Sequence, residues 1–502
     1  MLGPDFPFAY DEYLAHPAGL GHIPSRQYGK PVAIIGGGLS GIVTAFELMR
    51  LGLRPVVFEA GQLGGRLRTH YFPGFPRDVN AMLGAMRFPA AATSLSHYIK
   101  EVGLKTTPLP IPLSETSPST VIGLEGKTYY GRKVDDFPQI FQDVALAWER
   151  TLEEQASFSK MRTAIRERDT PTIKRIWNQV VREREGQSFY GFLQQSPAFH
   201  SFRFREVLGQ VGFGTGGWDS DFPSSILEIL RLVCTGADED HYSIIGGSAQ
   251  LPEGLWHHGA AHVAHWPAGT SLATLHPGKK PLQKVTQLRR DEQGVIVVTD
   301  AAGCKHSFAA AVFTAQTRAL LSNIDCDSTL LPNDVWRAIE RMHFMGSSKV
   351  FIPVDRPFWL DLDPNTGRHV MSMTLTDRLL RGVYPLGSDP NRPAVICLSY
   401  TWADDSAKWA TLSARERADL AMRSLQTIRR HVTGPAVAIS WENEPGFLGA
   451  FKINRPSHYR YQRILFMHTP TGRVASAASR VFGPVITYPG TPDGPKGPYT
   501  PR

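Results

Sequence analysis

Residues 32–41, Val-Ala-Ile-Ile-Gly-Gly-Gly-Leu-Ser-Gly, decide the fold of this chain. The apolar run Val32–Ile35 predicts a buried parallel strand, and the apolar spacing over Ile42–Met49 predicts a helix. Between them stands the glycine pattern G-x-G-x-x-G of a strand–turn–helix unit that binds a pyrophosphate at the helix N-terminus. A glycine-rich turn of some other α/β protein is the alternative, and the flanking strand and helix argue against it.

A second predicted strand, Pro55–Phe58, ends at an acidic residue roughly twenty positions after the glycines, where dinucleotide-binding folds hold the ribose hydroxyls. We therefore predict an α/β fold with a Rossmann-like dinucleotide-binding domain. The cofactor-binding residues expected in this first unit are Gly36, Gly38, Leu39, Ser40, Gly41, Glu59 and Ala60.

Composition places the chain among globular proteins with more than one domain. It has 502 residues, 42% apolar and 20% charged, and no apolar stretch of membrane-spanning length. The N-terminus lacks the basic and apolar pattern of a secretion signal, so we expect a cytoplasmic protein without a membrane partner. The four cysteines are scattered, which predicts neither a disulfide framework nor a zinc site.

The net charge of +8 is mild for this length. The densest basic run, 160–184, is interrupted by acidic residues, so it is typical of a solvated helical face with local ion pairs. A nucleic-acid surface is the less favoured alternative, and we expect no nucleic-acid partner.

Two arginine motifs follow the second strand: Gly-Gly-Arg at 64–66, and Gly-Ala-Met-Arg-Phe-Pro at 84–89. Together with the dinucleotide unit they resemble the flavin-containing amine oxidase superfamily, and most closely its branch of bacterial L-amino-acid oxidases and tryptophan 2-monooxygenases. The resemblance implies FAD as the cofactor. It adds these residues to the expected cofactor site: Gly65, Arg66, Gly84, Ala85, Met86 and Arg87. A later strand pattern resembles the region that binds the adenine end, with Val285 as the expected contact.

Two cations match positions that carry chemistry in the superfamily. The resemblance implies that Arg87 holds the substrate carboxylate, and a guanidinium suits this role because it binds a carboxylate through two parallel hydrogen bonds. The alternative for Arg87 is a structural ion pair. Lys349, in the stretch 346–351, matches the lysine that contacts flavin N5 through water, and its alternative is a lysine on the solvent-facing side of a strand.

Three aromatic residues are candidates for the substrate pocket. Phe213 and Trp218 belong to a glycine-rich stretch, 206–218, that resembles a loop near the pocket in such enzymes, and a flexible surface loop is the alternative. Trp441 resembles a pocket wall for an aromatic substrate, although packing alone explains it almost as well.

The resemblance also divides the chain. It implies an FAD-binding domain interrupted by a mixed α+β substrate domain with a helical lobe around 137–195; a further helix is expected at 413–431. The expected boundaries are an N-terminal arm at 1–28, FAD-binding segments at 29–105, 244–345 and 441–482, substrate-domain segments at 106–243 and 346–440, and an atypical tail at 483–502.

The tail departs from the family. Where the family has an Ala-Gly-Asp motif and then Glu-Gly-Ala-Val opening a helix, residues 483–502 are rich in proline and glycine, which excludes a helix. Reading the codons one base early permits Ala-Gly-Asp and, further on, Trp-Ala-Glu-Gly-Ala-Val. Our hypothesis is a one-base deletion near the codon for Gly483. If the tail is genuine instead, the protein lacks a flavin-binding helix.

The resemblance implies the FAD-dependent oxidation of an L-amino acid by O2, with an aromatic side chain preferred. A 2-monooxygenase would release the amide and CO2, whereas an oxidase would release the keto acid, ammonia and hydrogen peroxide. A flavin-deficient homologue and an oxidase of amines without a carboxylate remain alternatives. The expected partners are the amino acid and O2; the oligomeric state, including a homodimer, stays open.

Overall fold

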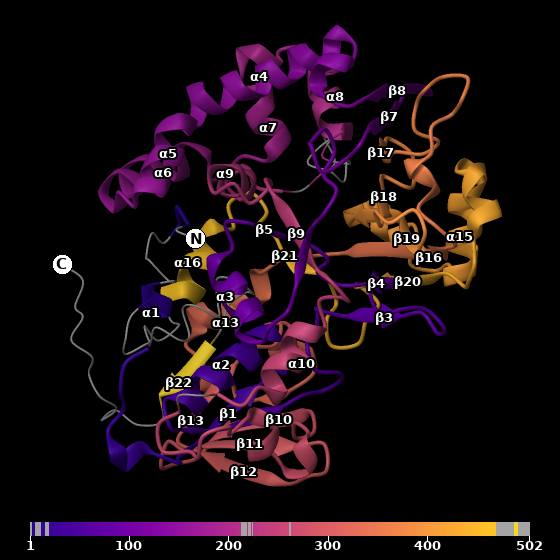
Figure 1. The fold of residues 1–502 in the computed structure, drawn as a ribbon. Coiled ribbons are helices and arrows are strands. Elements are labelled where there is room, and N and C mark those ends of the chain that lie inside the picture. The colour runs from indigo at the N-terminus through magenta and orange to yellow at the C-terminus, as the bar shows by residue number, and fades with distance from the viewer. Residues whose placement is uncertain are drawn as a thin grey trace.

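The computed structural model of this chain describes residues 3–5, 12–15, 20–211, 218, 222, 224–260, 263–467 and 486–489. Figure 1 shows three regions: an α/β region around β1 at the bottom, a large sheet around β16 at the right, and a lobe of helices at the top. Within the described residues, no helix has both the length and the apolar character needed to cross a membrane.

The α/β region is built on a sheet with the order β2-β1-β13-β22. Strands β2 (Arg54–Phe58), β1 (Pro31–Ile35) and β13 (Ala310–Phe313) run parallel, and β22 (Ile486–Pro489) lies antiparallel on the edge. The predicted strand–turn–helix unit is confirmed, since α2 (Leu39–Arg50) follows β1 directly after the glycines. This helix is the crossover that two parallel strands require.

A second sheet extends the α/β region. Its order is β12-β11-β10-β14, formed by β10 (Val285–Arg290), β11 (Ile296–Asp300), β12 (Lys305–Phe308) and β14 (Asp325–Cys326). Its apolar face shares one core with the first sheet, and α13 (Asn333–Arg341) and α16 (Tyr459–Met467) contribute to that core. This arrangement places the start of β10 close to the end of β2, beside the glycine turn.

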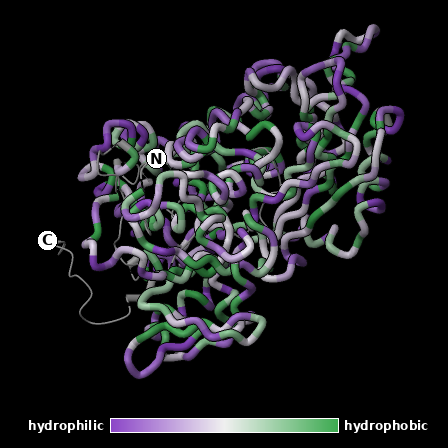
Figure 2. Tube along the Cα trace, turned by 60° about the horizontal axis from the view of Figure 1, so that its bottom comes forward, coloured by the Kyte–Doolittle hydropathy of each residue, from purple (hydrophilic) through white to green (hydrophobic). Residues whose placement is uncertain are grey.

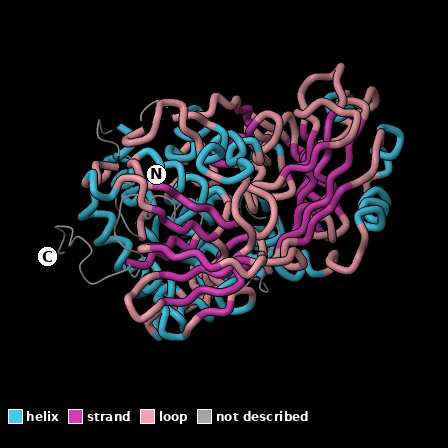
Figure 3. Tube along the Cα trace, turned by 90° about the horizontal axis from the view of Figure 1, so that it is seen from below, coloured by secondary structure: helices cyan, strands magenta, loops and turns pink. Residues whose placement is uncertain are grey.

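The region at the right of Figure 1 is a seven-stranded sheet with the order β20-β16-β19-β18-β17-β7-β8. Its strands are β7 (Thr120–Leu124), β8 (Lys127–Gly131), β16 (Ser347–Val354), β17 (Met373–Thr376), β18 (Gly382–Leu386), β19 (Ala394–Trp402) and β20 (Val437–Ser440). Every residue of β16 is buried, so a lysine in this strand is held inside the protein. Figure 3 shows this sheet well apart from the sheets of the α/β region.

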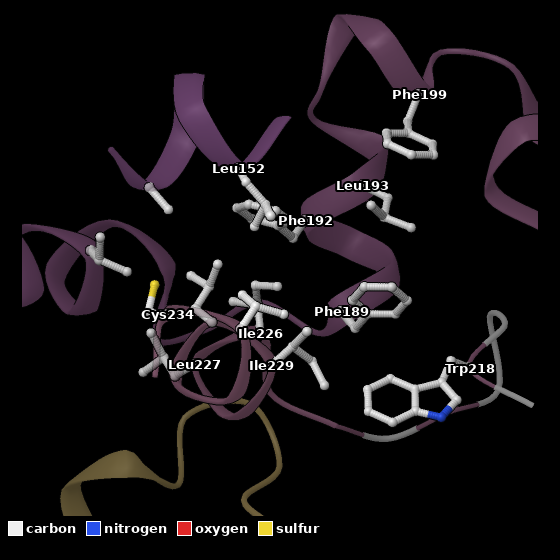
Figure 4. Packing of buried hydrophobic residues seen from close by; sticks show 14 of the residues in the cluster. Leu152, Phe189, Phe192, Leu193, Phe199, Trp218, Ile226, Leu227, Ile229 and Cys234 are labelled. Atoms are coloured by element: carbon white, nitrogen blue, oxygen red, sulfur yellow. The ribbon is translucent and has the colours of Figure 1, made fainter. Parts of the chain in front are cut away.

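The lobe consists of helices whose apolar faces meet in one core. They are α4 (Gln139–Ala156), α5 (Phe158–Glu167), α6 (Thr170–Arg184), α7 (Phe189–Gln194), α8 (Phe202–Val211) and α9 (Ile226–Cys234). Figure 4 shows aromatic residues of α7 packed near the apolar face of α9, with Trp218 at the margin of the cluster. The predicted helical lobe is therefore confirmed, and Trp218 anchors its lower edge.

Short elements connect these regions. The helices are α1 (Glu12–Ala15), α3 (Thr93–Glu101), α10 (Gln250–His257), α11 (Leu272–Leu275), α12 (Ala319–Ser322) and α14 (Ala403–Ala407). The strands are β3 (Thr69–Tyr71), β4 (Asn80–Met82), β5 (Phe88–Pro89), β6 (Thr106–Pro108), β9 (His241–Ile244), β15 (Phe344–Met345) and β21 (Phe451–Lys452). Figure 2 shows hydrophobic residues gathered along the interior strands and hydrophilic residues on many outer turns.

One predicted element was wrong in extent, and two expectations lie partly outside the described residues. The helix expected at 413–431 ends at Ser424; a 3₁₀ segment, Gln426–His431, follows it. A helix that starts with the Ser413 capping box stops there because Leu425 leaves helical geometry, with φ −127° and ψ 59°. Phe213 lies outside the described residues, as does the tail except for β22.

Candidate active site

A cavity of about 1390 Å³ lies where the three regions meet. Its walls come from the glycine turn after β1, the segments that carry the two arginine motifs, strand β16, and the face of α9 that points away from the lobe core. Segments far apart in the sequence therefore build one site.

The glycine turn forms a cradle at one end of this cavity. Gly36 adopts φ +116°, a conformation that favours glycine, and a Cβ on Gly41 would lie 1.8 Å from the Gly36 carbonyl oxygen. A Cβ on Gly38 would meet nothing within 4 Å, because this glycine faces the cavity. The turn thus leaves open space at the start of α2, where backbone N–H groups and the helix dipole favour an anion.

The Glu59 carboxylate closes the same end. It accepts hydrogen bonds from the backbone N–H groups of Gly37 (2.6 Å) and Gly61 (2.7 Å). Burial raises the pKa of Glu59, although these backbone hydrogen bonds oppose the shift. One bond to each oxygen leaves acceptor capacity toward the cavity, which suits the hydroxyl pair of a sugar. Val285, at the start of β10, lies in the same wall.

Arg66 supplies a positive charge to the middle of the cavity. Its Nη1 donates to the carbonyl oxygen of Ala450 at 2.8 Å, and burial lowers its pKa to about 10. Among the described residues no carboxylate pairs with it, so the site offers a half-buried cation to an anionic ligand. The two arginine motifs pack so closely that a Cβ on Gly84 would lie 1.7 Å from the Arg66 carbonyl oxygen.

Arg87 enters the cavity just before β5 and is half-buried. Its guanidinium carbon lies 5.9 Å from the ring centroid of Tyr384, on β18. The described part of the chain shows no ion pair to Arg87, so the structural ion pair considered from the sequence is not found there. Burial raises the pKa of Tyr384 to about 12, which keeps this phenol neutral and able to donate a hydrogen bond beside the cation.

His241, on β9, is a second neighbour of Arg87. Burial and the Arg87 charge lower its pKa to about 4, so the imidazole is neutral near pH 7. Its Nε2 lies 3.0 Å from the Ala237 carbonyl oxygen, which assigns the proton to Nε2 and leaves Nδ1 as an acceptor. Nδ1 is buried and has no partner among the described residues.

Lys349 lies inside the protein rather than on a solvent-facing strand, because its exposure is only 4%. Its Nζ donates to the carbonyl oxygen of Gly84 at 2.6 Å and lies 4.7 Å from the ring centroid of Tyr400. Burial, together with the Arg87 charge, lowers the pKa of Lys349 to about 7. A neutral amine and an ammonium are thus both accessible at this atom near neutral pH.

Aromatic side chains line the part of the cavity next to the lobe. Trp402 is central, with ring centroids 5.6 Å from Trp218 and 5.0 Å from Phe451. Trp218 also stacks on Phe222 at 4.7 Å. Trp441 lies in another part of the wall, where its Nε1 donates to the Leu83 carbonyl oxygen at 3.0 Å. The cavity can therefore hold a flat apolar group.

Several buried polar atoms in these walls have no hydrogen-bond partner within the described chain. Among them are Ser248 Oγ, Thr317 Oγ1, Asp238 Oδ1, Gln316 Oε1 and His241 Nδ1. Because buried polar groups are normally satisfied, this pattern fits a cavity made for a large polar ligand. No group of three or more His, Cys, Asp or Glu side chains in the described residues is placed to hold a metal ion.

The structure brings nearly all the predicted site residues to this one cavity. Gly41 lies behind the wall and serves the close packing of α2 on β1, while Phe213 is outside the described residues. Sequence reasoning missed Tyr384, Tyr400 and His241. Tyr384 and His241 stand in ordinary strand patterns without a motif, so no local signal distinguished them from core residues.

A family model described as flavin containing amine oxidoreductase matches residues 39–482. The tryptophan 2-monooxygenase of Pantoea agglomerans pv. gypsophilae is 28% identical over 497 residues, which cover 90% of this chain and 84% of that protein. That of Pseudomonas savastanoi is 29% identical over 513 residues, covering 93% and 87%. The putative L-amino-acid oxidase YobN of Bacillus subtilis (strain 168) is 25% identical over 470 residues, covering 90% of each.

Solved structures share the fold. Putrescine oxidase, wild type bound to putrescine, has a TM-score of 0.64 at 18% identity, covering 89% of this chain and 92% of that chain. Cyclohexylamine oxidase from Brevibacterium oxydans IH-35A has a TM-score of 0.62 at 14% identity, with the same coverage. These likenesses confirm the predicted Rossmann-like domain with an inserted substrate domain.

Proposed function

The chain belongs to the flavin-containing amine oxidoreductase family, and from this premise we propose that it uses FAD and O2 to oxidise an aromatic L-amino acid. The proposed outcome is that of a 2-monooxygenase, which releases the amide with one carbon fewer and CO2. The relatives named tryptophan 2-monooxygenase support this outcome, since they match along nine-tenths of the chain. The oxidase outcome, supported by the relative named as an L-amino-acid oxidase, is the second candidate.

The observation that carries the proposal is Arg87. It is a half-buried cation at the cavity wall, with a neutral phenol beside it and no carboxylate partner in the described residues. An amine substrate without a carboxylate would leave this charge uncompensated, whereas an amino acid supplies two oxygens for the guanidinium fork. We therefore favour an amino acid over a simple amine.

The cradle at the start of α2 would hold FAD. The residues proposed to contact it are Gly36, Gly38, Leu39, Ser40, Glu59, Ala60, Gly65, Arg66, Gly84, Ala85, Met86, Arg87 and Val285, all of which line the cavity. Arg66 and the α2 N-terminus would face the pyrophosphate, and Glu59 the ribose. A bound flavin supplies the two-electron oxidation of the amine and the reaction with O2.

The protein's own side chains then position the substrate and handle protons. Arg87 fixes the carboxylate, and Tyr384 offers a second donor close to it. Lys349, whose pKa is about 7, can hold a water molecule at Nζ or exchange a proton there without a large penalty. Its hydrogen bond to the Gly84 carbonyl oxygen holds that amine at a fixed position relative to the segment that carries Arg87.

The aromatic walls supply the preference for the side chain. Trp218 and Trp402, whose rings are tilted by 46° to each other, form an apolar aromatic wall near the lobe, and ring contacts with this wall favour an aromatic group. Trp441, which directly follows β20 in the seven-stranded sheet, is proposed to complete the pocket, and Phe213, outside the described residues, remains a candidate.

Product analysis separates the candidates. The holoenzyme is incubated with L-tryptophan in air, and the products are identified by mass spectrometry together with a peroxide assay. The proposal predicts the amide with one carbon fewer and little peroxide. A keto acid with stoichiometric peroxide would establish the oxidase, and turnover of tryptamine but not of L-tryptophan would contradict the amino-acid assignment.

A further inference from the structure

A group of four charged side chains lies in the same cavity but plays no part in the chemistry proposed above. We call it the α9 charge cluster: Asp5, Glu228, Arg231 and Lys452. Helix α9 turns its apolar residues into the lobe core, while Glu228, Arg231, Leu232 and Thr235 form a stripe at helical spacing along the cavity. The cluster is thus built into a wall of the site.

Within this cluster, both carboxylate oxygens of Glu228 already have partners. It accepts from Lys452 Nζ at 3.0 Å and from the Asn454 backbone N–H at 2.8 Å, and it pairs with Arg231. Although burial opposes it, the charges of Arg231 and Lys452 lower the pKa of Glu228 to about 2. Two cations therefore face one permanent carboxylate, which leaves one positive charge for another anion.

Asp5 supplies that anion from the far end of the chain. Both of its oxygens meet Arg231: Oδ2 accepts from Nε, and Oδ1 accepts from Nη2 at 3.1 Å. Such a two-point contact is the geometry in which a guanidinium binds any carboxylate. The Asp5 side chain is only 6% exposed, so it occupies this position inside the protein.

We propose that Arg231 is a second carboxylate-binding site in the cavity, and that Asp5 occupies it as a ligand supplied by the chain itself. The external ligands are small carboxylates, among them the amino acid that the proposed function assigns to Arg87; this ligand class rests on that function. Asp5 and an external carboxylate exclude each other, because both need the same two donors of Arg231. Release of Asp5 opens the site.

The strength of the competition between Asp5 and an external carboxylate for Arg231 depends on the effective concentration of Asp5 at this site. A ligand that is part of the same chain as its site competes as an intramolecular partner, and for short flexible connections its effective concentration reaches the millimolar range. An external carboxylate of comparable intrinsic affinity is therefore kept off Arg231 at lower concentrations. Replacing Asp5 by asparagine preserves its shape but removes the charge, so external binding at Arg231 should tighten by roughly tenfold or more.

The test counts benzoate sites on the full-length holoenzyme by isothermal titration calorimetry. We expect one equivalent in the wild type and two in Asp5→Asn. The added equivalent must persist in Asp5→Asn/Arg87→Gln and vanish in Asp5→Asn/Arg231→Gln. Asp78→Asn is the matched control, because Asp78 pairs with Arg392 at an exposed position away from the cavity. It should bind benzoate like the wild type.

The outcomes separate this inference from the proposed function. If Arg87 binds no carboxylate, the wild type shows no site and Asp5→Asn shows one, which still supports Arg231. An unchanged number of sites in Asp5→Asn would overturn the inference, as would an added site that survives Arg231→Gln. If Asp5→Asn does not fold, wild-type crystals soaked in concentrated p-bromobenzoate give the answer, since a bromine peak beside Arg231 is required.

Discussion

Lys349 and Gly84 are joined by a 2.6 Å hydrogen bond from the lysine Nζ to the glycine carbonyl oxygen, although 265 residues separate them. This bond ties the buried strand β16 to the motif that carries Arg87. Arg87 and Lys349, which match the family in separate stretches of sequence, are thereby held close to each other. The interactions around these two residues lead to the following predictions.

Burial of Lys349 should make stability depend on pH. Its pKa falls from 10.5 to about 7 in the folded protein, so between these values the unfolded chain binds more protons. The stability contributed by this group therefore rises from about pH 7 toward pH 10 and is lowest below pH 7, with each pKa unit worth about 1.4 kcal/mol.

Lys349→Met removes this penalty. The melting temperature of the variant, relative to the wild type, should be higher near pH 6 than near pH 10. Differential scanning calorimetry of both proteins across this range measures the difference. Lys100→Met, at an exposed position on α3, serves as the control. A difference that does not vary with pH would contradict the burial of an ionisable amine at position 349.

The glycine cradle offers a matched pair of substitutions. Gly38→Ala places a methyl group in open space at the cavity, so the apoprotein should keep its melting temperature while flavin affinity falls at least about tenfold. Gly41→Ala instead forces the methyl group against the Gly36 carbonyl oxygen and should destabilise the fold by more than about 2 kcal/mol. Fluorescence titration with FAD and thermal melts read the two effects. Unchanged FAD affinity in Gly38→Ala would show that the glycine turn is not part of the cofactor-binding site.

Trp402 should determine the preference for aromatic substrates. Trp402→Leu removes the ring that contacts Trp218 and Phe451, and we expect kcat/KM for L-tryptophan to fall by roughly 10- to 100-fold. The value for L-alanine should change little. Trp409→Leu, which deletes a fully buried tryptophan outside the cavity, controls for lost stability. Equal losses for both substrates would argue for a purely structural role.

The hypothesis of a shifted reading frame is testable on the gene. The family match ends at residue 482, just before the atypical tail. Resequencing should reveal a missing base near the codon for Gly483, and a frame-restored protein should retain FAD more tightly through gel filtration than the chain as written. An intact frame in the genome would reject the hypothesis.

Local motifs made most of the site predictable. The glycine turn and both arginine motifs are contiguous stretches whose spacing constrains their geometry, and nearly all of their predicted residues line one cavity. Tyr384 and Arg231 could not be found in this way. Tyr384, on β18, lies near Arg87 although the two are far apart in the sequence, and Arg231 meets Asp5 across 226 residues. Such contacts depend on tertiary packing and leave no local pattern.

The ends of helices were also hard to predict from the sequence. Apolar spacing continues past Ser424, but the backbone at Leu425 leaves the helical region, so α15 (Ala414–Ser424) ends before the predicted position. Periodicity reports which residues face the core. It does not report where the chain must turn to reach its next partner.

The central claim is that Arg87 selects a carboxylate-bearing amine, and anaerobic reduction of the bound flavin tests it most directly. L-tryptophan and tryptamine are added separately to the wild type and to Arg87→Gln, and the loss of flavin absorbance is followed by stopped flow. We predict that L-tryptophan bleaches the wild type at low concentration and that Arg87→Gln needs roughly 100-fold more, with tryptamine equally poor for both. Equal response of the two proteins to L-tryptophan would contradict the account.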